Sequence, residues 1–491
     1  MSTVDRSNQW KLDPADLAAE LGSWSAGPGP LYRQLAAAVA QLLDDGAIAS
    51  GTVLPPERRL AGRLAVSRGT VVNAYRLLDQ QGWLRRVQGR GTIVTGPARS
   101  PGGADRPLET GDPGRTNPSL RTIDLLAAIP DALPEVLDIC QRTNLLRDPD
   151  IVDNAEPAGI YPLRSCVAEM YDDLGLSTSP EQIVVTSGAQ QALALTVNAI
   201  TRPGDVALVE AFTWPGLLDV VQGAGARVHA APMDDDGIVV DQLSAMVERL
   251  RPRLIAINPH NHNPTGTCLP PTRREAVAEI CAEFGVTIIE DRVAALMGFN
   301  GEVPPPLAAH RPDGSHVTIG SLNKVTWPGL RIGWIRTDTP TVATLRAAKA
   351  LNDLYSSIPS QLMALDTFGS LGELQQVRRD KMFEQATMLM SELRTRLPEW
   401  RFRSPQGGVV LWVELPGGRA TAFSQTARSF GVSVPTSAEF AAGADGDDHL
   451  RLPFTLPPRV LQEAVQRLAT AWSRFSNDRV PAGARAAPSI I

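Results

Sequence analysis

Lysine is scarce in this chain. Of 47 basic residues only four are lysines, Lys11, Lys324, Lys349 and Lys381, and the others are arginines. Arginine can replace lysine as a solvated charge, but it stays protonated and cannot form a Schiff base with a carbonyl compound. Lys324 lies in SLNKVTWPGLRIGW (321–334), beside residues that can hold an anion, and is therefore the leading candidate for a reactive amine.

Cysteine is equally rare, and long apolar runs are missing. The four cysteines, Cys140, Cys166, Cys268 and Cys281, form no CxxC pair and show no metal-ligand spacing, which favours buried, reduced thiols and no metal site. No run approaches the length of a membrane-spanning helix, and the first residues lack a basic and then apolar signal region. We therefore expect a cytoplasmic protein.

Charge is distributed unevenly over the 491 residues, which are enough for two or three domains. Between Gly27 and Pro97 nine arginines stand against four acidic residues, a net charge of +5. Since the whole chain carries −6, the remainder carries −11. A basic module attached to an acidic body indicates that only the first part meets a polyanion.

Composition also predicts the domain boundaries. The segment 97–120 is rich in Pro, Gly and polar residues without periodicity, as in a flexible linker. It separates a module at 30–96, preceded by an N-terminal arm at 1–29, from a body at 121–476. Residues 477–491 are expected to be a disordered tail.

The basic module has the pattern of a winged helix-turn-helix. Apolar spacing predicts helices over 31–43, from about 55 to 65, and from Ser67 to about 81, with a tight turn before the third. WLRRVQGRGTIV (83–94) then predicts two short strands, the wing. Six residues are expected to contact DNA bases or phosphates: Arg58, Ser67, Arg68, Thr70, Arg86 and Arg90.

These segments carry a family resemblance. LYRQLA, LPPERRLAGRLAVSRGTVVNAYRLLDQQGW and QGRGTIV resemble the GntR class of winged-helix repressors. The family usually has serine where Pro56 stands, so the second helix loses one possible cap. The resemblance implies that the module binds double-stranded DNA.

The acidic body alternates apolar β-branched runs with helix-length segments. Such a pattern predicts an α/β fold with a parallel sheet covered on both faces, whose ligands bind beyond the carboxyl ends of the strands. Ten residues near those ends suit pyridoxal 5'-phosphate (PLP): Ser187, Gly188, Ala189, Gln190, Trp214, Asn263, Asp291, Ser321, Lys324 and Arg331.

Their predicted roles cover each part of PLP. Ser187 and the amides that open the following helix form an anion site, to which Ser321 and Arg331 add a hydroxyl and a fixed charge. The remaining four residues serve the ring and the aldehyde. Asp291 pairs with the pyridine nitrogen, Asn263 donates to the phenolic oxygen, Trp214 offers a flat face, and Lys324 forms the Schiff base.

In this arrangement the body resembles fold type I PLP enzymes of the aspartate aminotransferase class, with large and small subdomains, over about 122–473. The resemblance implies that Arg451, in DDHLRLPF, grips an amino acid carboxylate; the alternative is a surface ion pair with Asp447 or Asp448. Two tyrosines that the family often carries are missing. Val293 and Ala294 occupy one position, and Asn154, with Tyr161 nearby, the other.

A GntR-type module joined to such a body resembles MocR-type transcriptional regulators. We expect a homodimer that binds two DNA half-sites and senses PLP, or an amino acid or amine, through Lys324. Two alternatives stay open. One is a catalytically active aminotransferase with a tethered DNA-binding module, and the other is a DNA-binding protein whose body is a scaffold without cofactor.

Overall fold

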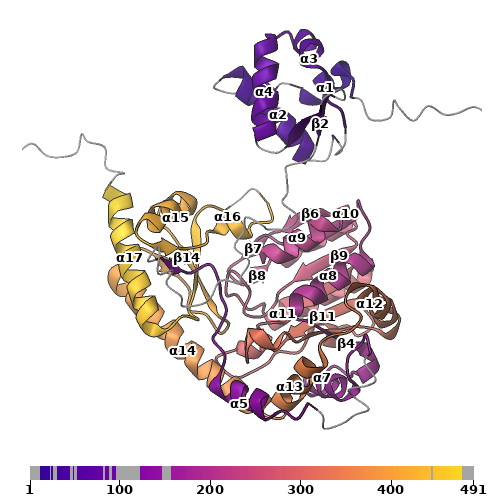
Figure 1. Cartoon of the computed structure of the whole chain (residues 1–491), viewed down its shortest axis with the longest axis vertical. Helices are drawn as coiled ribbons and strands as arrows, with labels where there is room; N and C mark the ends of the chain where they lie inside the picture. Colours follow the sequence, from indigo (N-terminus) through magenta and orange to yellow (C-terminus); the bar gives the residue numbers. More distant parts are fainter. Residues whose placement is uncertain are drawn as a thin grey trace, which may run out of the picture. The chain divides into compact units, whose positions relative to one another are not determined.

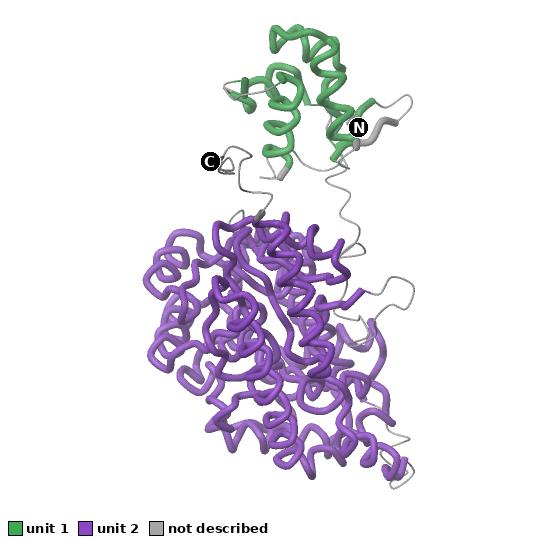
Figure 2. The backbone as a smooth tube through the Cα atoms, turned by 90° about the vertical axis from the view of Figure 1, so that its left-hand side faces the viewer, with its two compact units in different colours: residues 1–105 green, residues 106–491 purple. Residues whose placement is uncertain are grey.

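The computed structural model forms two compact units, residues 1–105 and 106–491, shown in different colours in Figure 2. The residues it describes are 12–22, 24–25, 30–44, 48, 52–80, 83–87, 91–94, 122–145, 156–443 and 446–477. The expected linker at 97–120 and all but the first residue of the expected tail lie outside these ranges. Each unit is described by itself.

The first unit is a helical module with a two-stranded wing (Figure 1). Its elements are α1 (Pro14–Leu21), α2 (Leu31–Asp44), α3 (Glu57–Arg63), α4 (Arg68–Gln80), β1 (Leu84–Val87) and β2 (Gly91–Val94). The strands pair antiparallel, with Leu84 opposite Val94. The three expected helices and the wing are confirmed.

Helix α1 was not predicted, because its residues fall in the expected arm at 1–29. Asp13 caps it by accepting from the Ala15 amide at 2.8 Å, and Pro14 suits the first turn. Leu17 is fully buried in the same apolar core as residues of α2 and α4. Part of the arm therefore belongs to the core of the module.

The turn before α4 is built as the sequence indicates. The Ser67 hydroxyl accepts from the Thr70 amide at 3.0 Å and so caps the helix. At α3, by contrast, Pro56 stands at the cap and provides no side-chain bond. The buried Tyr75 hydroxyl donates to the Pro55 carbonyl at 3.0 Å, which ties α4 to the segment before α3.

The second unit is centred on a seven-stranded sheet. The strand order is β4 (Ile183–Thr186), β12 (Gly333–Arg336), β11 (His316–Ser321), β10 (Thr287–Asp291), β9 (Leu254–Ile257), β5 (Val206–Glu210) and β6 (Arg227–Ala231). The five predicted strands run parallel to one another, as expected, whereas β12, which was not predicted, runs antiparallel to both of its neighbours. The short connection from β11 to β12 leaves no room for the crossover that a parallel pair requires.

Helices cover both faces of this sheet (Figure 1). Consecutive side chains of a strand point to opposite faces, so neighbours such as Ile288 and Ile289 pack in separate apolar clusters. One face is covered by α8 (Ala189–Ile200), α9 (Pro215–Gly223) and α12 (Thr339–Asn352). The other is covered by α7 (Tyr161–Asp173), α10 (Val240–Leu250), α11 (Pro271–Phe284) and α13 (Ile358–Phe368).

A small subdomain packs around a second core. It has a three-stranded antiparallel sheet, β13 (Arg401–Phe402), β14 (Val410–Glu414) and β16 (His449–Pro453), and the helices α14 (Leu371–Arg396), α15 (Ala420–Ser429), α16 (Ser437–Phe440) and α17 (Pro458–Asn477). Strand β3 (Ile123–Asp124) joins it by pairing with β15 (Val432–Ser433). The remaining elements are α5 (Pro134–Arg142), β7 (Met233–Asp234), β8 (Gly237–Ile238) and four single 3-10 turns, Pro180–Gln182, Ala295–Met297, Leu307–Ala309 and Pro328–Leu330.

All four cysteines are free thiols. Only Cys281 is buried, and burial raises its pKa to about 12. Cys140, Cys166 and Cys268 are half-buried, so the expectation that every thiol is buried was wrong for these three. Within the described ranges, the structure contains no helix that is both long and apolar enough to cross a membrane.

Candidate functional site

The predicted cofactor residues meet at one edge of the large sheet. Ser187 follows β4, Asp291 ends β10, and Ser321 ends β11, three residues before Lys324. These strands run parallel to one another, so their carboxyl ends share an edge. Arg331 precedes β12, whose opposite direction brings its start to the same edge.

A turn between β4 and α8 forms the anion-binding part. Gly188 has φ +107°, a conformation that favours glycine, and a Cβ there would lie 3.1 Å from Nη2 of Arg331. That nitrogen donates to the Ser187 carbonyl at 2.7 Å. Gly333 approaches so closely that its own Cβ would lie 2.9 Å from the Ala189 amide nitrogen. The first amides of α8 and one guanidinium thus lie together at this turn, which are the groups that bind a phosphate at the start of a helix.

Two side chains in this turn were missed from the sequence. Gln191 accepts from the Ser187 amide at 2.8 Å and so fixes the turn. The Asn323 amide reaches Gly188, 3.5 Å from where a Cβ would be, and its Oδ1 is buried without a hydrogen-bond partner among the described residues. Its place immediately before Lys324 was the available signal.

Ser321 and Gln190 have other surroundings than the prediction assumed. The Ser321 hydroxyl is buried, donates to the Ile332 carbonyl at 3.0 Å and accepts from the Asn323 amide at 3.2 Å. In this structure it therefore shapes the loop that carries Lys324. The Gln190 side chain is exposed, in the first turn of α8. Whether either residue also reaches a phosphate stays a prediction.

Asp291 is the acid of the site. Its Oδ1 accepts from the Val293 amide at 2.9 Å, and the Asn258 side chain donates to the carboxyl as well. Burial raises the pKa of Asp291, the two hydrogen bonds and the charge of Lys324 lower it, and Glu210 raises it further. The charge of Lys324 therefore acts on Asp291.

Lys324 and Arg451 both contact a segment that the sequence did not suggest. Lys324 donates from Nζ to the Ala128 carbonyl at 2.7 Å. Arg451 donates to the Leu126 carbonyl and, at 3.4 Å, to Oδ1 of Asn263. The segment after β3 therefore runs through the site.

Arg451 is not a surface residue. It is 1% exposed and lies over the Phe440 ring, with its guanidinium carbon 4.9 Å from the centroid. Asp448 contacts His449, and Asp447 accepts from Thr421. The alternative of a surface ion pair is therefore wrong, while the grip on a ligand carboxylate stays a prediction.

Two aromatic residues of the predicted site, Trp214 and Tyr161, are described by the structure, and whether Trp214 faces the ring of PLP stays a prediction. The indole of Trp214 folds against Gly216, where a Cβ would lie 2.4 Å from the ring, and packs on the apolar cluster beneath α8 and α9. Tyr161 is 57% exposed, with the Arg164 guanidinium 5.5 Å from its ring centroid. Asn154, the other substitute for a missing tyrosine, lies outside the described residues.

The expected DNA-contacting residues are partly described. Arg58 and Arg68 are exposed, and the hydroxyls of Ser67 and Thr70 lie 2.9 Å apart at the start of α4. Arg86 is on β1, opposite Thr92, but the orientation of its side chain is outside what the structure describes. Arg90 falls outside the described residues.

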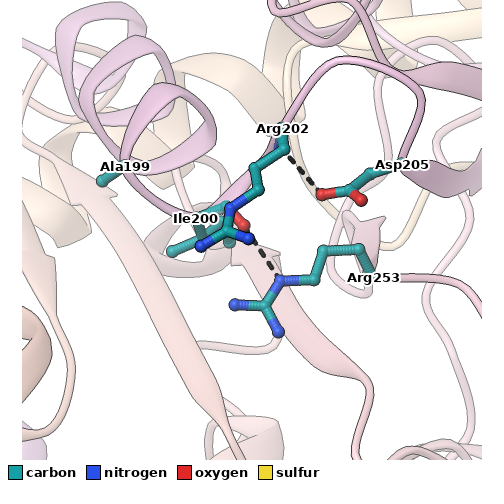
Figure 3. Close-up of a pocket in the computed structure, with 5 residues that line it drawn as sticks. All are labelled: Ala199, Ile200, Arg202, Asp205 and Arg253. Carbon is teal, nitrogen blue, oxygen red and sulfur yellow. Dashed lines mark hydrogen bonds between the residues drawn. The ribbon is translucent and has the colours of Figure 1, made fainter.

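The second unit has a surface cavity of about 350 Å³ (Figure 3). It lies at the edge of the large sheet opposite to the predicted cofactor residues. Arg202 and Asp205 precede β5, and Arg253, which precedes β9, donates to the Ile200 carbonyl at 2.9 Å (Figure 3). None of the predicted cofactor residues lines it. Because ligands of such sheets bind at the carboxyl ends, it is not the cofactor site.

Comparisons with known proteins agree with the division of the chain into an N-terminal helix-turn-helix unit and a larger second unit. Residues 31–94 match the gntR family of bacterial regulatory proteins, and residues 130–468 match aminotransferase class I and II. The HTH-type transcriptional regulator YisV of Bacillus subtilis is 30% identical over 78% of this chain and 84% of its own length. The regulator YjiR of Escherichia coli is 26% identical over 90% of this chain and 98% of its own length.

Among solved structures, LysN, an alpha-aminoadipate aminotransferase from Thermus thermophilus in complex with N-(5'-phosphopyridoxyl)-L-leucine, matches with a TM-score of 0.67 and 26% identity. The match covers 72% of this chain and 93% of that one. The chain therefore belongs to the HTH-type transcriptional regulators in which a gntR-family domain is fused to a class I and II aminotransferase domain, which is consistent with the MocR type.

Proposed function

We propose that this regulator binds PLP at Lys324 and uses it to sense an amino acid or amine, with Arg451 selecting ligands that carry a carboxylate. The observation that carries the proposal is that Lys324, Asp291 and the turn at Ser187 follow the carboxyl ends of parallel strands at one edge of the sheet, in a chain that also has a DNA-binding domain.

The residues present suit PLP. A Cβ at Gly188 would crowd the Arg331 guanidinium at 3.1 Å, so glycine lets that guanidinium and the Asn323 side-chain amide approach the turn. PLP, when bound, supplies an aldehyde that condenses with a primary amine. The chain supplies that amine at Lys324, a carboxylate for the ring nitrogen at Asp291, and the anion-binding turn at Ser187.

Ligand recognition would alter contacts that the segment after β3 makes in this structure. Lys324 and Arg451 hold the carbonyls of Ala128 and Leu126, respectively. An amino acid that engages both side chains would compete with those carbonyls. Because this segment belongs to the small subdomain through β3, its displacement offers a physical route from ligand binding to a change in domain geometry.

We further propose that the protein acts as a homodimer. Two DNA-binding domains related by twofold symmetry match the two half-sites of an operator. Apolar side chains at the end of α12 and in the connection to α13 are exposed and would suit contact with a second copy: Leu351 is 92%, Leu354 64% and Tyr355 44% exposed. Patches of this kind on a folded domain mark interaction surfaces.

The test is an operator-binding titration of the full chain, with and without PLP and a panel of amino acids and amines, with visible absorbance followed in parallel. We expect PLP to produce the absorbance band of lysine-bound PLP and at least one ligand to change operator affinity. Lys324→Ala should abolish the band and the response to PLP and ligand but keep DNA binding. Lys381→Ala is the matched control, because Lys381 is a partly exposed lysine 3.8 Å from Asp131.

An unchanged response to PLP and ligand in Lys324→Ala would contradict sensing at this lysine. A parent protein that acquires no band after PLP addition would support the scaffold alternative. A catalytically active aminotransferase is the second candidate, favoured by a 2-aminoadipate transaminase of Thermus thermophilus that is 29% identical over 64% of this chain. Steady turnover of an amino acid with 2-oxoglutarate at ordinary aminotransferase rates, independent of the N-terminal unit, would support that candidate.

A further inference from the structure

Two buried ionisable side chains, those of Glu210 and His262, lie near Asp291 and are connected to it through Asn258. Glu210 ends β5 and His262 follows β9, and their side chains are 3% and 1% exposed. Nε2 of His262 lies 3.2 Å from Oε2 of Glu210. Nδ1 of His262 accepts from the Thr265 backbone amide at 3.4 Å, so the proton of the neutral ring is on Nε2, the nitrogen nearer Glu210; the approach of Nε2 to Glu210 is a contact without hydrogen-bond geometry. Taking such a pair out of water costs free energy, so its position calls for an explanation.

Glu210 is connected to Asp291 through one residue. Its Oε2 accepts from the Asn258 amide at 2.7 Å. The side chain of the same Asn258 donates to Asp291. Glu210 therefore fixes the backbone of the residue that orients the Asp291 carboxyl.

The His262 ring is held on its other side as well. Its Nδ1 lies 2.7 Å from the Thr265 hydroxyl, which in turn lies 2.9 Å from the Thr267 hydroxyl. With the proton on Nε2, the neutral ring accepts from Thr265. Thr265 thus holds the imidazole with its Nε2 toward Glu210.

The charges around Asp291 oppose one another. Lys324 and Glu210 are the charged groups that act on it, from the loop after β11 and from the end of β5. Glu210 faces His262, with Nε2 of the histidine 3.2 Å from its Oε2. A proton on His262 directed at Glu210 offsets the negative charge that Asp291 would otherwise experience.

We propose that Glu210 and His262 are positioning residues for Asp291, acting through Asn258, and that they set the charge that Asp291 presents to the ring nitrogen of PLP. The inference rests on the proposed binding of PLP at Lys324. It assigns opposite electrostatic effects to the two members of the pair, which a purely structural role would not produce.

The experiment follows PLP affinity and visible absorbance of the full chain from pH 8 down through the acid range. Glu210→Gln removes a negative charge but keeps an acceptor for the Asn258 amide, so the acid midpoint should fall by about half a pH unit or more. His262→Leu removes the proton facing Glu210, so the midpoint should rise by a similar amount. His262→Gln keeps an N–H donor at this position, so its acid midpoint should lie closer to the midpoint of the parent than that of His262→Leu does.

Matched controls lie in a second buried cluster. Glu290 precedes Asp291 on β10, points to the opposite face, and accepts from Arg292 and the Leu307 amide. Glu290→Gln, and His260→Gln beside it, should leave the midpoint unchanged. Thermal melting of each variant without PLP reports folding. Should His262→Leu fail to fold, the near-isosteric Glu210→Gln and His262→Gln still test the direction.

Midpoints that shift in opposite directions for the two members of the pair support the inference. Midpoints that stay at the parent's value, or move in the same direction, overturn it even where PLP affinity falls. A parent protein that binds no PLP overturns the proposed function and this inference together. The two failures are thereby distinguished.

Discussion

Arg331 donates from Nη2 to the carbonyl oxygen of Ser187 at 2.7 Å, across 144 residues of sequence. The bond joins the start of β12 to the turn after β4, the pair of strands whose antiparallel register the sequence did not suggest. It also places a permanent positive charge beside the first amides of α8. The bond stabilises the turn, and we expect anion affinity to depend on this arginine as well.

Replacing Arg331 should weaken PLP binding more than it weakens the fold. In Arg331→Ala the turn after β4 loses its fixed charge, and charge-assisted bonds contribute about 1.5–3 kcal/mol each, or roughly 10- to 100-fold in the dissociation constant. Fluorescence titration with PLP measures the change. Arg311→Ala, at an exposed pair with Asp313, is the control and should bind PLP as the parent does. Equal affinity of Arg331→Ala and parent would show that PLP phosphate binds elsewhere.

The Lys349–Asp353 pair should have a measurable pH signature. Lys349 is 0% exposed, and its Nζ donates to both carboxylate oxygens of Asp353 at 2.7 and 2.8 Å. Burial lowers the pKa of Lys349, while Asp353 raises it. Asp353→Ala removes the raising contribution, so the folded-state pKa of Lys349 falls further below its unfolded value.

Asp353→Ala should cost about 2 kcal/mol or more of stability at pH 7, because it leaves a buried ammonium without its carboxylate. A depressed lysine pKa means that the unfolded chain binds more protons, so stability rises with pH between the folded and unfolded pKa values. The deficit should therefore shrink when urea unfolding is measured toward pH 10. Asp313→Ala, at a surface pair, should show a small deficit. A deficit for Asp353→Ala that is constant with pH would contradict this account.

The sequence predicted the winged module, the strands β4, β5, β9, β10 and β11, and the gathering of Ser187, Asp291 and Lys324. Those predictions depend on local periodicity and on the rule that strand ends carry ligands. What it did not predict depends on contacts between distant segments. The Leu126 and Ala128 carbonyls that meet Arg451 and Lys324 belong to an irregular segment, and backbone carbonyls leave no mark in a sequence.

Other differences have similarly specific causes. Strand β12 is a short apolar run, and its antiparallel direction follows from the length of a loop. Helix α1 is only eight residues long, so its apolar spacing is too short to stand out from the polar segment in which it lies. Glu210 and His262 are buried polar residues, and periodicity treats polar residues as surface positions.

Charging the apolar surface between α12 and α13 should separate the proposed dimer. Leu351→Asp with Leu354→Asp places two carboxylates where apolar side chains are 92% and 64% exposed, so the isolated chain should remain folded. Sedimentation analysis should then give the monomer mass of 52.6 kDa. Affinity for a two-half-site operator should fall while affinity for a single half-site is retained. Val377→Asp, at a 39% exposed position on α14, is the control. A double variant that stays dimeric would place the interface elsewhere.

Neighbouring residues at the start of α4 should separate stability from DNA affinity. Ser67→Ala removes the cap on the Thr70 amide and should lower the stability of the N-terminal unit by about 1 kcal/mol. Arg68→Ala removes an exposed side chain that does not cap the helix, so the stability of the N-terminal unit should be unchanged. Its operator affinity should fall, and if the contact is to a phosphate, the slope of log affinity against log salt should decrease by about 1.

Arg76 provides the control for Arg68, because it is also exposed and lies two turns further along the same helix. Helix-turn-helix domains contact bases and phosphates chiefly through the first residues of the recognition helix, so Arg76→Ala should have a smaller effect on operator affinity. Filter binding at several salt concentrations measures both affinity and slope. If Arg76→Ala weakens binding more than Arg68→Ala does, the start of α4 is not the part of the helix that enters the groove.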